Sequence, residues 1–130
     1  MDIIWYTHHT YYDMANEAPR KLRVAFYRTP GGAELVRDWL RSLDVRERRA
    51  IGTDLLRIQF RWPVGMPLCR AMGEGLWEAR TTLPSNRIAR VLFFVNRDRI
   101  VLLHGFIKKT QKTPDEELTL ARKRRKEFDD

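Results

Sequence analysis

The chain has 130 residues, a formal net charge of +8 and 43% hydrophobic residues. This length favours one domain with a real core, and the positive charge favours polyanionic or acidic partners. One cysteine excludes an internal disulfide, the three histidines lack the spacing of a zinc site, and no apolar run reaches the roughly 18–20 residues of a membrane helix. The first residues contain no basic leader before an apolar stretch, so we expect a cytoplasmic protein. We also expect no metal, cofactor or membrane partner.

The first half of the chain predicts a strand and a helical hairpin. Residues 1–20 are aromatic and polar without periodicity, and we treat them as an extension before a domain over residues 21–130. Lys21–Thr29 alternates apolar and polar residues, which predicts a strand ending at Pro30. A first helix is then predicted by apolar residues that recur at the spacing of one helical face: Leu35, Val36, Trp39, Leu40 and Leu43. Asp44 is the predicted N-cap of a second helix, with Glu47 as its capping-box partner.

The second half predicts four strands and a closing helix. The strands are joined by short turns, which favour antiparallel neighbours, and helices should cover one side of the sheet. Thr113 is the predicted N-cap of the last helix, with Leu118, Ala121 and Phe128 on its inner face. The fold class is therefore α+β, with a small antiparallel sheet built from an N-terminal strand, a helical hairpin and a meander. The meander strands are Pro67–Met72, Leu76–Leu83, Arg87–Asn96 and Arg99–Lys109.

Three segments carry a family resemblance: Val36–Leu43 (VRDWLRSL), Gly75–Arg80 (GLWEAR) and Leu102–Pro114 (LLHGFIKKTQKTP). From about Val24 to Phe128 the chain resembles the phage-derived HigB-like toxins of the RelE/ParE superfamily. The KKTQKTP string is the most specific part, because that family joins its final strand to its final helix there. The resemblance implies a RelE-like fold, a small antiparallel sheet with helices packed on one face.

The same resemblance implies a function. RelE-like toxins of type II toxin–antitoxin systems are ribosome-dependent endoribonucleases, or mRNA interferases, which cleave translated messenger RNA without a metal. A small cognate antitoxin neutralises them, and in the HigB-like branch this antitoxin usually carries a helix-turn-helix domain, as in HigA. The implied partners are thus the antitoxin, the ribosome and messenger RNA, with DNA reached only through the antitoxin.

The residue types needed for such chemistry are present in the predicted strands. Metal-free cleavage requires deprotonation of the 2′-oxygen, protonation of the leaving 5′-oxygen and stabilisation of the charge on phosphorus, tasks suited to His, Arg and Lys. Arg80 and Arg90 lie within the second and third meander strands. An exposed strand face also tolerates Arg, but the resemblance places both residues in an RNA-binding cleft. Arg87 is a competing candidate for this role, but its odd spacing from Arg90 places it on the opposite face of the strand.

His104 has two interpretations, either a packed core residue or the catalytic acid or base. Period two places His104, Phe106 and Lys108 on one face of the last strand and Lys109 on the other, which favours a His104–Lys108 pair. The expected catalytic set is Arg80, Arg90, His104 and Lys108. The expected RNA-binding set is Arg87, Lys109, Lys112, Arg122, Arg124 and Arg125.

Several of these residues have alternative interpretations. Lysines and arginines in a basic run are commonly solvated, and the run over 122–126 suits ribosomal RNA or the antitoxin better than catalysis. Glu78 fits an ion pair, an antitoxin contact or a base equally well, and Cys69 receives no role. Two non-enzymatic hypotheses stay open: a catalytically silent partner of a repressor-like protein that binds nucleic acid, and a phage protein that binds the ribosome without cutting.

Overall fold

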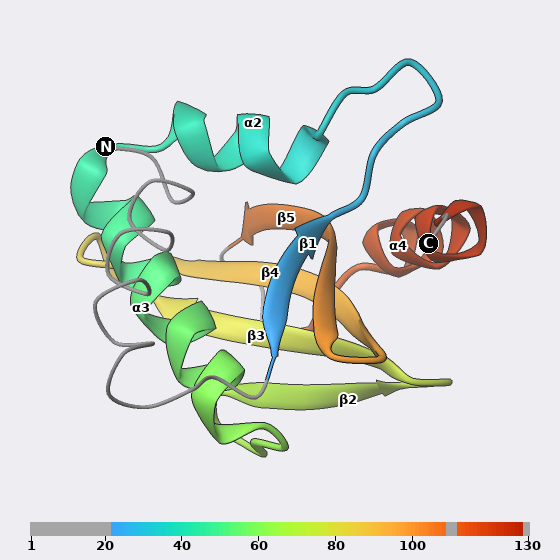
Figure 1. The fold of residues 1–130 in the computed structure, drawn as a ribbon. Coiled ribbons are helices and arrows are strands. Elements are labelled where there is room, and N and C mark those ends of the chain that lie inside the picture. Colours follow the sequence, from blue (N-terminus) through green and yellow to red (C-terminus); the bar gives the residue numbers. More distant parts are fainter. Residues whose placement is uncertain (1–21, 109–111, 129–130) are drawn as a thin grey trace.

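The computed structural model describes residues 22–108 and 112–128, with Lys108 described for its backbone (Figure 1). The predicted extension over residues 1–20 and the predicted RNA contact at Lys109 lie outside these residues. Every predicted strand and helix within the described ranges is present. The elements are β1 (Arg23–Phe26), α2 (Leu35–Ser42), α3 (Val45–Arg61), β2 (Cys69–Gly73), β3 (Leu76–Thr82), β4 (Ile88–Asn96), β5 (Arg99–Lys108) and α4 (Asp115–Glu127).

The five strands form one sheet in the order β1-β5-β4-β3-β2. Strands β2 to β5 are the predicted antiparallel meander. Strand β1 instead pairs in parallel with β5, with Arg23 opposite Arg99 and Phe26 opposite Leu102, so the expected all-antiparallel sheet is a mixed one. The reason is the long helical connection after β1, because a crossover of this kind allows a parallel neighbour that a tight hairpin would forbid.

Helices cover both faces of the sheet, which corrects the expectation of a single covered face. Helices α2 and α3 pack through Leu40 and Ile51 on one face, together with β5 residues such as Ile100. Helix α4 packs through Ala121 on the other face, with Val101 of the same strand (Figure 1). The two faces differ because successive strand residues point in opposite directions, and β5 is apolar on both sides. Of the predicted inner residues of α4, Ala121 is buried, and Leu118 and Phe128 pack beside it.

The two predicted helix caps have different outcomes. The Asp44 carboxylate accepts a hydrogen bond from the Glu47 backbone N–H at 2.9 Å, which confirms the N-cap of α3. The Glu47 side chain does not complete a capping box, because it pairs with Arg87. Thr113 is not the N-cap of α4; Pro114 occupies that position, and the Thr113 side chain is buried in the sheet face below. Among the described residues, no helix is long and apolar enough to cross a membrane.

Candidate functional site

The predicted catalytic residues with described side chains share the face of the sheet that α4 covers. The strand register places Arg80 opposite Arg90 and Arg90 opposite Phe106. One row along, His104 lies opposite Leu92, a core residue on the α4 side. The register therefore confirms that His104 and Phe106 face the same way, and their rings stack with centroids 5.4 Å apart. The backbone of Lys108 continues this alternation opposite Ile88.

Arg90 lies in a closed polar cluster and not in an open cleft. Its side chain has 0% exposure, and its Nη1 donates to the Thr113 hydroxyl oxygen at 3.4 Å. The Thr113 hydroxyl in turn donates to the Glu78 carboxylate, which is also buried. Burial lowers the pKa of the Arg90 guanidinium, and the nearby negative charge of Glu78 opposes this shift. The expectation of an open cleft at Arg90 is wrong because the segment before α4 covers the side chain.

Among the predicted catalytic residues with described side chains, Arg80 is the most exposed. Its Nε lies 3.7 Å from Glu78 Oε1, and a fifth of its side chain is exposed. The sequence prediction missed Arg70, an exposed residue of β2 that lies opposite Glu78 in the register. The register of β2, β3 and β4 places Arg70, Arg80 and Arg90 on one face of neighbouring strands, and the positive charges of Arg80 and Arg70 both lower the pKa of Arg90. The turn at Gly73–Gly75 does not reveal Arg70, because a bulge between Ala71 and Gly73 shifts the β2–β3 register directly after it.

His104 is held by two residues of α4. Its Nε2 lies 2.8 Å from Glu117 Oε2, and Arg124 Nη1 lies 3.4 Å from its Nδ1. A guanidinium only donates hydrogen bonds, so Nδ1 is the acceptor and Nε2 carries the hydrogen that is donated to Glu117. Arg124 also donates to the Leu103 carbonyl at 2.8 Å. Of the two interpretations of His104, the packed and hydrogen-bonded one describes its position, and the acid–base role stays a prediction.

The predicted RNA-binding arginines have partners within the fold. Arg87 pairs with Glu47 of α3, on the opposite side of the sheet from Arg90, so the predicted separation of these two arginines is confirmed. Arg122 donates to the Met72 carbonyl at 2.9 Å, and Arg125 donates to the Glu74 carbonyl. Together with Arg124 they fasten α4 to the strands beneath it. Their proposed contact with RNA stays a prediction, as does that of the exposed Lys112.

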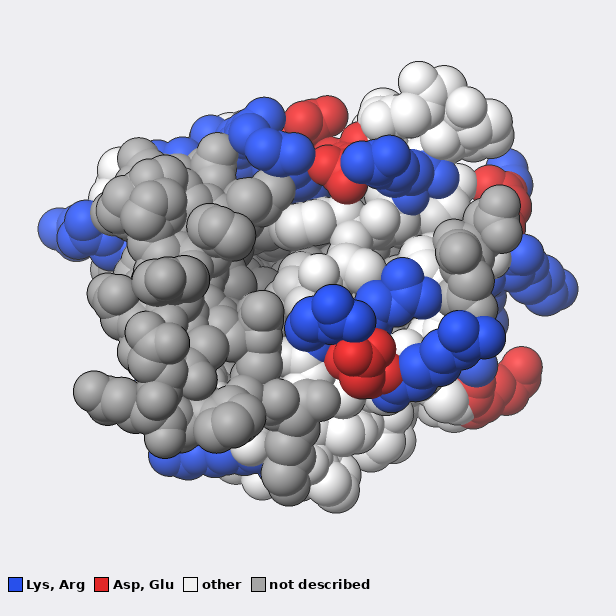
Figure 2. Space-filling model, viewed as in Figure 1, with Lys and Arg blue, Asp and Glu red and all other residues white. Residues whose placement is uncertain are grey.

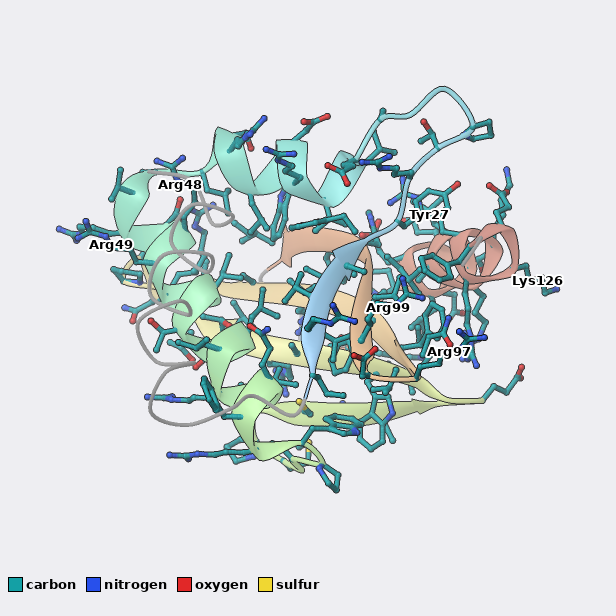
Figure 3. All side chains as sticks on the ribbon, viewed as in Figure 1. Tyr27, Arg48, Arg49, Arg97, Arg99 and Lys126 are labelled. Carbon is teal, nitrogen blue, oxygen red and sulfur yellow. The ribbon has the colours of Figure 1, made fainter. Side chains whose placement is uncertain are left out.

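Aromatic residues secure the far end of α4. The Tyr27 hydroxyl donates to Glu127 at 2.6 Å, and this hydrogen bond raises the pKa of Tyr27. The Arg99 guanidinium lies 5.4 Å from the centre of the Phe128 ring, and Figure 3 shows Arg99 and Tyr27 beside α4. On the face drawn in Figure 2, basic side chains cover more of the coloured surface than acidic ones do. Within the described ranges, no three His, Cys, Asp or Glu side chains are grouped so that they could hold a metal ion.

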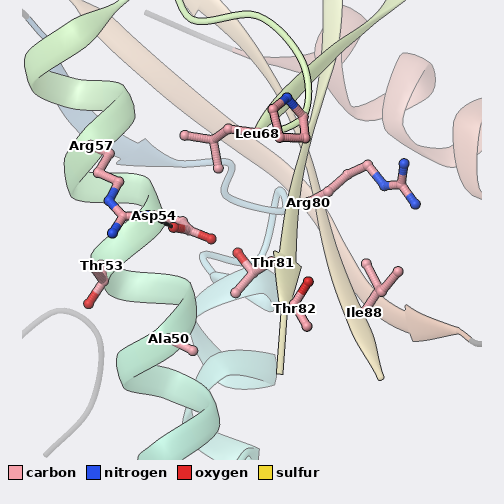
Figure 4. A pocket seen from close by; sticks show the side chains of 10 residues that line it. Ala50, Thr53, Asp54, Arg57, Leu68, Arg80, Thr81, Thr82 and Ile88 are labelled. Atoms are coloured by element: carbon pink, nitrogen blue, oxygen red, sulfur yellow. Dashed lines mark hydrogen bonds and ion pairs between the residues drawn. The ribbon is translucent and has the colours of Figure 1, made fainter. Parts of the chain in front are cut away.

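A cleft of about 650 Å³ lies beside Arg80, between α3 and the end of β3 (Figure 4).

The sequence of the chain is similar to a known protein family. A family model described as phage derived protein Gp49-like (DUF891) matches residues 38–126, which include all the candidate residues discussed above on β2 to β5 and α4. No curated protein matches the chain.

Proposed function

The chain belongs to the phage-derived Gp49-like family, which is associated with toxin–antitoxin modules, and on this premise we propose that it is the toxin of a type II pair and a ribosome-dependent endoribonuclease. The observation that carries the proposal is the group of three guanidinium groups, from Arg70, Arg80 and Arg90, beside His104 on one sheet face. A group of this kind suits the charge that develops on a phosphate during cleavage. It also fits the HigB-like resemblance within the RelE/ParE superfamily.

In the proposed reaction, the 2′-oxygen of one nucleotide attacks the adjacent phosphorus, a 2′,3′-cyclic phosphate forms and the bond to the 5′-oxygen breaks. Arg80 and Arg70 hold the phosphate oxygens, since both side chains reach solvent. Arg90 is enclosed, so it acts as a positioning residue through Glu78 and Thr113.

The proton transfers are assigned to His104 and Lys108, which alternate on one face of β5. The base takes the 2′-hydroxyl proton, and the acid gives a proton to the leaving 5′-oxygen. In the described arrangement both ring nitrogens of His104 face partners on α4. One of these contacts therefore has to be exchanged for a contact with RNA.

The proposed partners follow from the same function. They are messenger RNA on the ribosome and a cognate antitoxin with a helix-turn-helix domain, which would connect the toxin to DNA. The net charge of +8 supports polyanionic and acidic partners of this kind. The proposed location is the cytoplasm, where translation takes place.

A second candidate is a catalytically silent protein that works through binding. The observation that favours it is the mutual pairing of the polar groups, since Glu78 and Thr113 enclose Arg90 while Glu117 and Arg124 hold His104. In this reading the cluster fastens α4 and performs no chemistry.

Induced expression in bacteria separates the two candidates. We expect rapid growth arrest and new ends inside translated frames of an abundant messenger RNA, detected by primer extension, and no new ends when translation is blocked beforehand. Arg80→Ala should relieve both effects, whereas Arg49→Ala, an exposed change on α3, should not. Normal growth and intact messages, with the folded protein present at full level, would support the silent protein.

A further inference from the structure

The cleft beside Arg80 opens where the sheet loses one of its strands. Strand β2 pairs with β3 as far as Ala79, and the Arg80 backbone N–H then donates to the Leu68 carbonyl at 2.9 Å. Thr81 and Thr82 lie beyond this point and line the cleft together with residues of α3. Arg80 therefore belongs to both sites: it lines the cleft, and its guanidinium points away from α3 toward the other face of the sheet (Figure 4).

The walls of the cleft combine apolar surface with hydrogen-bonding groups. Ala50, Leu68 and Ile88 supply apolar surface, while Thr53, Thr81 and Thr82 supply hydroxyl groups. A volume of about 650 Å³ lies in the range of small-molecule sites, which are mostly apolar with a few polar groups that fix orientation. A flat heteroaromatic ring matches this combination, because its faces are apolar and its edge carries donors and acceptors.

Asp54 gives the cleft a charged acceptor. Its side chain is 15% exposed, and Figure 4 shows its carboxylate pointing from α3 toward the end of β3. Oδ1 accepts a hydrogen bond from Arg57 at 3.1 Å, and a carboxylate has about four lone-pair sites, so it can accept further hydrogen bonds. The negative charge of Asp54 also contributes to the raised pKa of Cys69, after the larger effect of burial.

We infer that this cleft binds one nucleobase of the RNA, and that Asp54 selects a base with an amino group on its pairing edge. Adenine, cytosine and guanine present such an amino group, which a carboxylate accepts well, as Asp and Glu do with cytosine N4. Uracil has no amino group: its single N–H on the pairing edge lies between two carbonyl oxygens, which repel a carboxylate that approaches it. The inference that the ligand is RNA rests on the proposed function, but base binding in the cleft does not require cleavage.

The test uses the purified full chain and four probes: AMP, CMP, GMP and UMP. Backbone amide resonances of Thr53, Thr81 and Thr82 should shift with each of the first three nucleotides, and UMP should bind about tenfold more weakly, since a hydrogen bond to a charged group typically contributes that factor or more. Asp54→Asn should remove the discrimination against UMP. Asp38→Asn, the same change at an exposed position of α2, should keep it.

A steric variant keeps the inference testable if Asp54→Asn does not fold. Ala50→Leu places a larger side chain into the cleft from a helix that tolerates Leu, and it should weaken binding of all four nucleotides. Equal binding of UMP and the other nucleotides by the wild-type chain, or resonance shifts confined to another surface, would overturn the inference.

Cleavage mapping separates this inference from the proposed function. If the wild-type chain discriminates among the nucleotides but cuts no RNA, the enzyme proposal fails and the base site stands. If the chain cuts RNA while no nucleotide shifts the amides of the cleft, the base site fails and the enzyme proposal stands. When both hold, uracil should be depleted at one position next to the cleavage site, and Asp54→Asn should restore it.

Discussion

The hydroxyl group of Thr113 donates a hydrogen bond to the carboxylate of Glu78, which ties the segment before α4 to the middle of β3. The same hydroxyl oxygen accepts from Arg90 at 3.4 Å. A neutral side chain thus connects a buried carboxylate and a buried guanidinium, and all three residues are less than a tenth exposed. Because this link also determines what covers Arg90, it connects the stability of the domain to the shape of the candidate site.

Removing the Glu78 carboxylate should destabilise the domain strongly. Glu78→Ala leaves Arg90 buried beside Arg80 without the opposite charge, and breaking a buried pair in this way costs about 3–5 kcal/mol in the free energy of unfolding. Thr113→Val keeps the shape and removes the hydroxyl, at a cost of about 1–3 kcal/mol. Urea unfolding curves measure both changes.

Glu34→Ala is the control for Glu78→Ala. It breaks ion pairs with Arg28 and Arg37 that are more exposed than the Glu78 cluster, and it should cost about 1 kcal/mol or less. A Glu78 variant as stable as the Glu34 variant would contradict the buried link.

Arg80 and Arg90 should separate into an activity residue and a stability residue. Arg80→Ala should reduce cleavage by about a hundredfold or more, the typical loss when a donor to the reacting charge is removed. Its loss of stability should be smaller than that of Arg90→Ala, because Glu78 keeps the Thr113 hydrogen bond and the nearby charge of Arg90. Arg90→Ala empties a fully buried site and removes the nearby positive charge of Arg90 from the buried Glu78 carboxylate, which keeps Thr113 and Arg80, and it should cost about 3–5 kcal/mol. Denaturant unfolding and cleavage rates measured on the same preparations test the split. If Arg90→Ala folds with normal stability and loses only cleavage, the enclosed position of Arg90 is wrong.

Gly105→Ala should destabilise β5 because a Cβ atom there would lie 2.3 Å from the Trp39 ring. No real contact is so short, so the ring or the strand must move, and overpacking of this kind costs about 1–3 kcal/mol or more. Gly31→Ala is the matched control, since the nearest atom to its Cβ is 4.0 Å away. Thermal unfolding compares the two variants. Equal melting temperatures would mean that Trp39 does not pack on Gly105.

The Cys69 thiol should resist alkylation in the folded protein. Burial raises its pKa to about 12, so the reactive thiolate is scarce at neutral or mildly alkaline pH. The unfolded chain loses this proton near its ordinary pKa of about 8.5, and the contribution of the thiol to stability is therefore lost as the pH rises from there through about 12. Iodoacetamide at about pH 8 should modify the chain only as fast as it unfolds, which mass spectrometry can follow. Modification faster than unfolding would show that Cys69 is accessible.

Periodicity predicts the elements of this fold better than it predicts their arrangement. Alternation along β3, β4 and β5 identifies each strand, since one residue in two faces each side of the sheet. It carries no information on whether β1 pairs in parallel or on which face α4 packs, because both depend on long-range contacts such as Ala121 against Val101. Thr113-Pro114 has the composition of a helix start, yet burial of Thr113 against Glu78 outweighs its preference for the cap.

The candidate site shows a similar limit. Spacing alone predicts that Arg87 and Arg90 are separated and that His104 and Phe106 share a face, since both follow from period two. It does not predict that α4 holds His104 through Glu117, or that Arg124 binds the Leu103 carbonyl, because these residues meet only after the helix docks. Arg70 and the cleft at Asp54 are likewise products of strand register and of the end of β2.

The most direct test of the central claim is the chemistry of the RNA ends made by the purified chain on translating ribosomes. We predict cuts within the translated message that leave a 2′,3′-cyclic phosphate and a 5′-hydroxyl, loss of these cuts in Arg80→Ala and their retention in Arg49→Ala. Intact messages at every concentration, ends that carry a 5′-phosphate, or an Arg80→Ala protein as active as the wild type would contradict the proposed site.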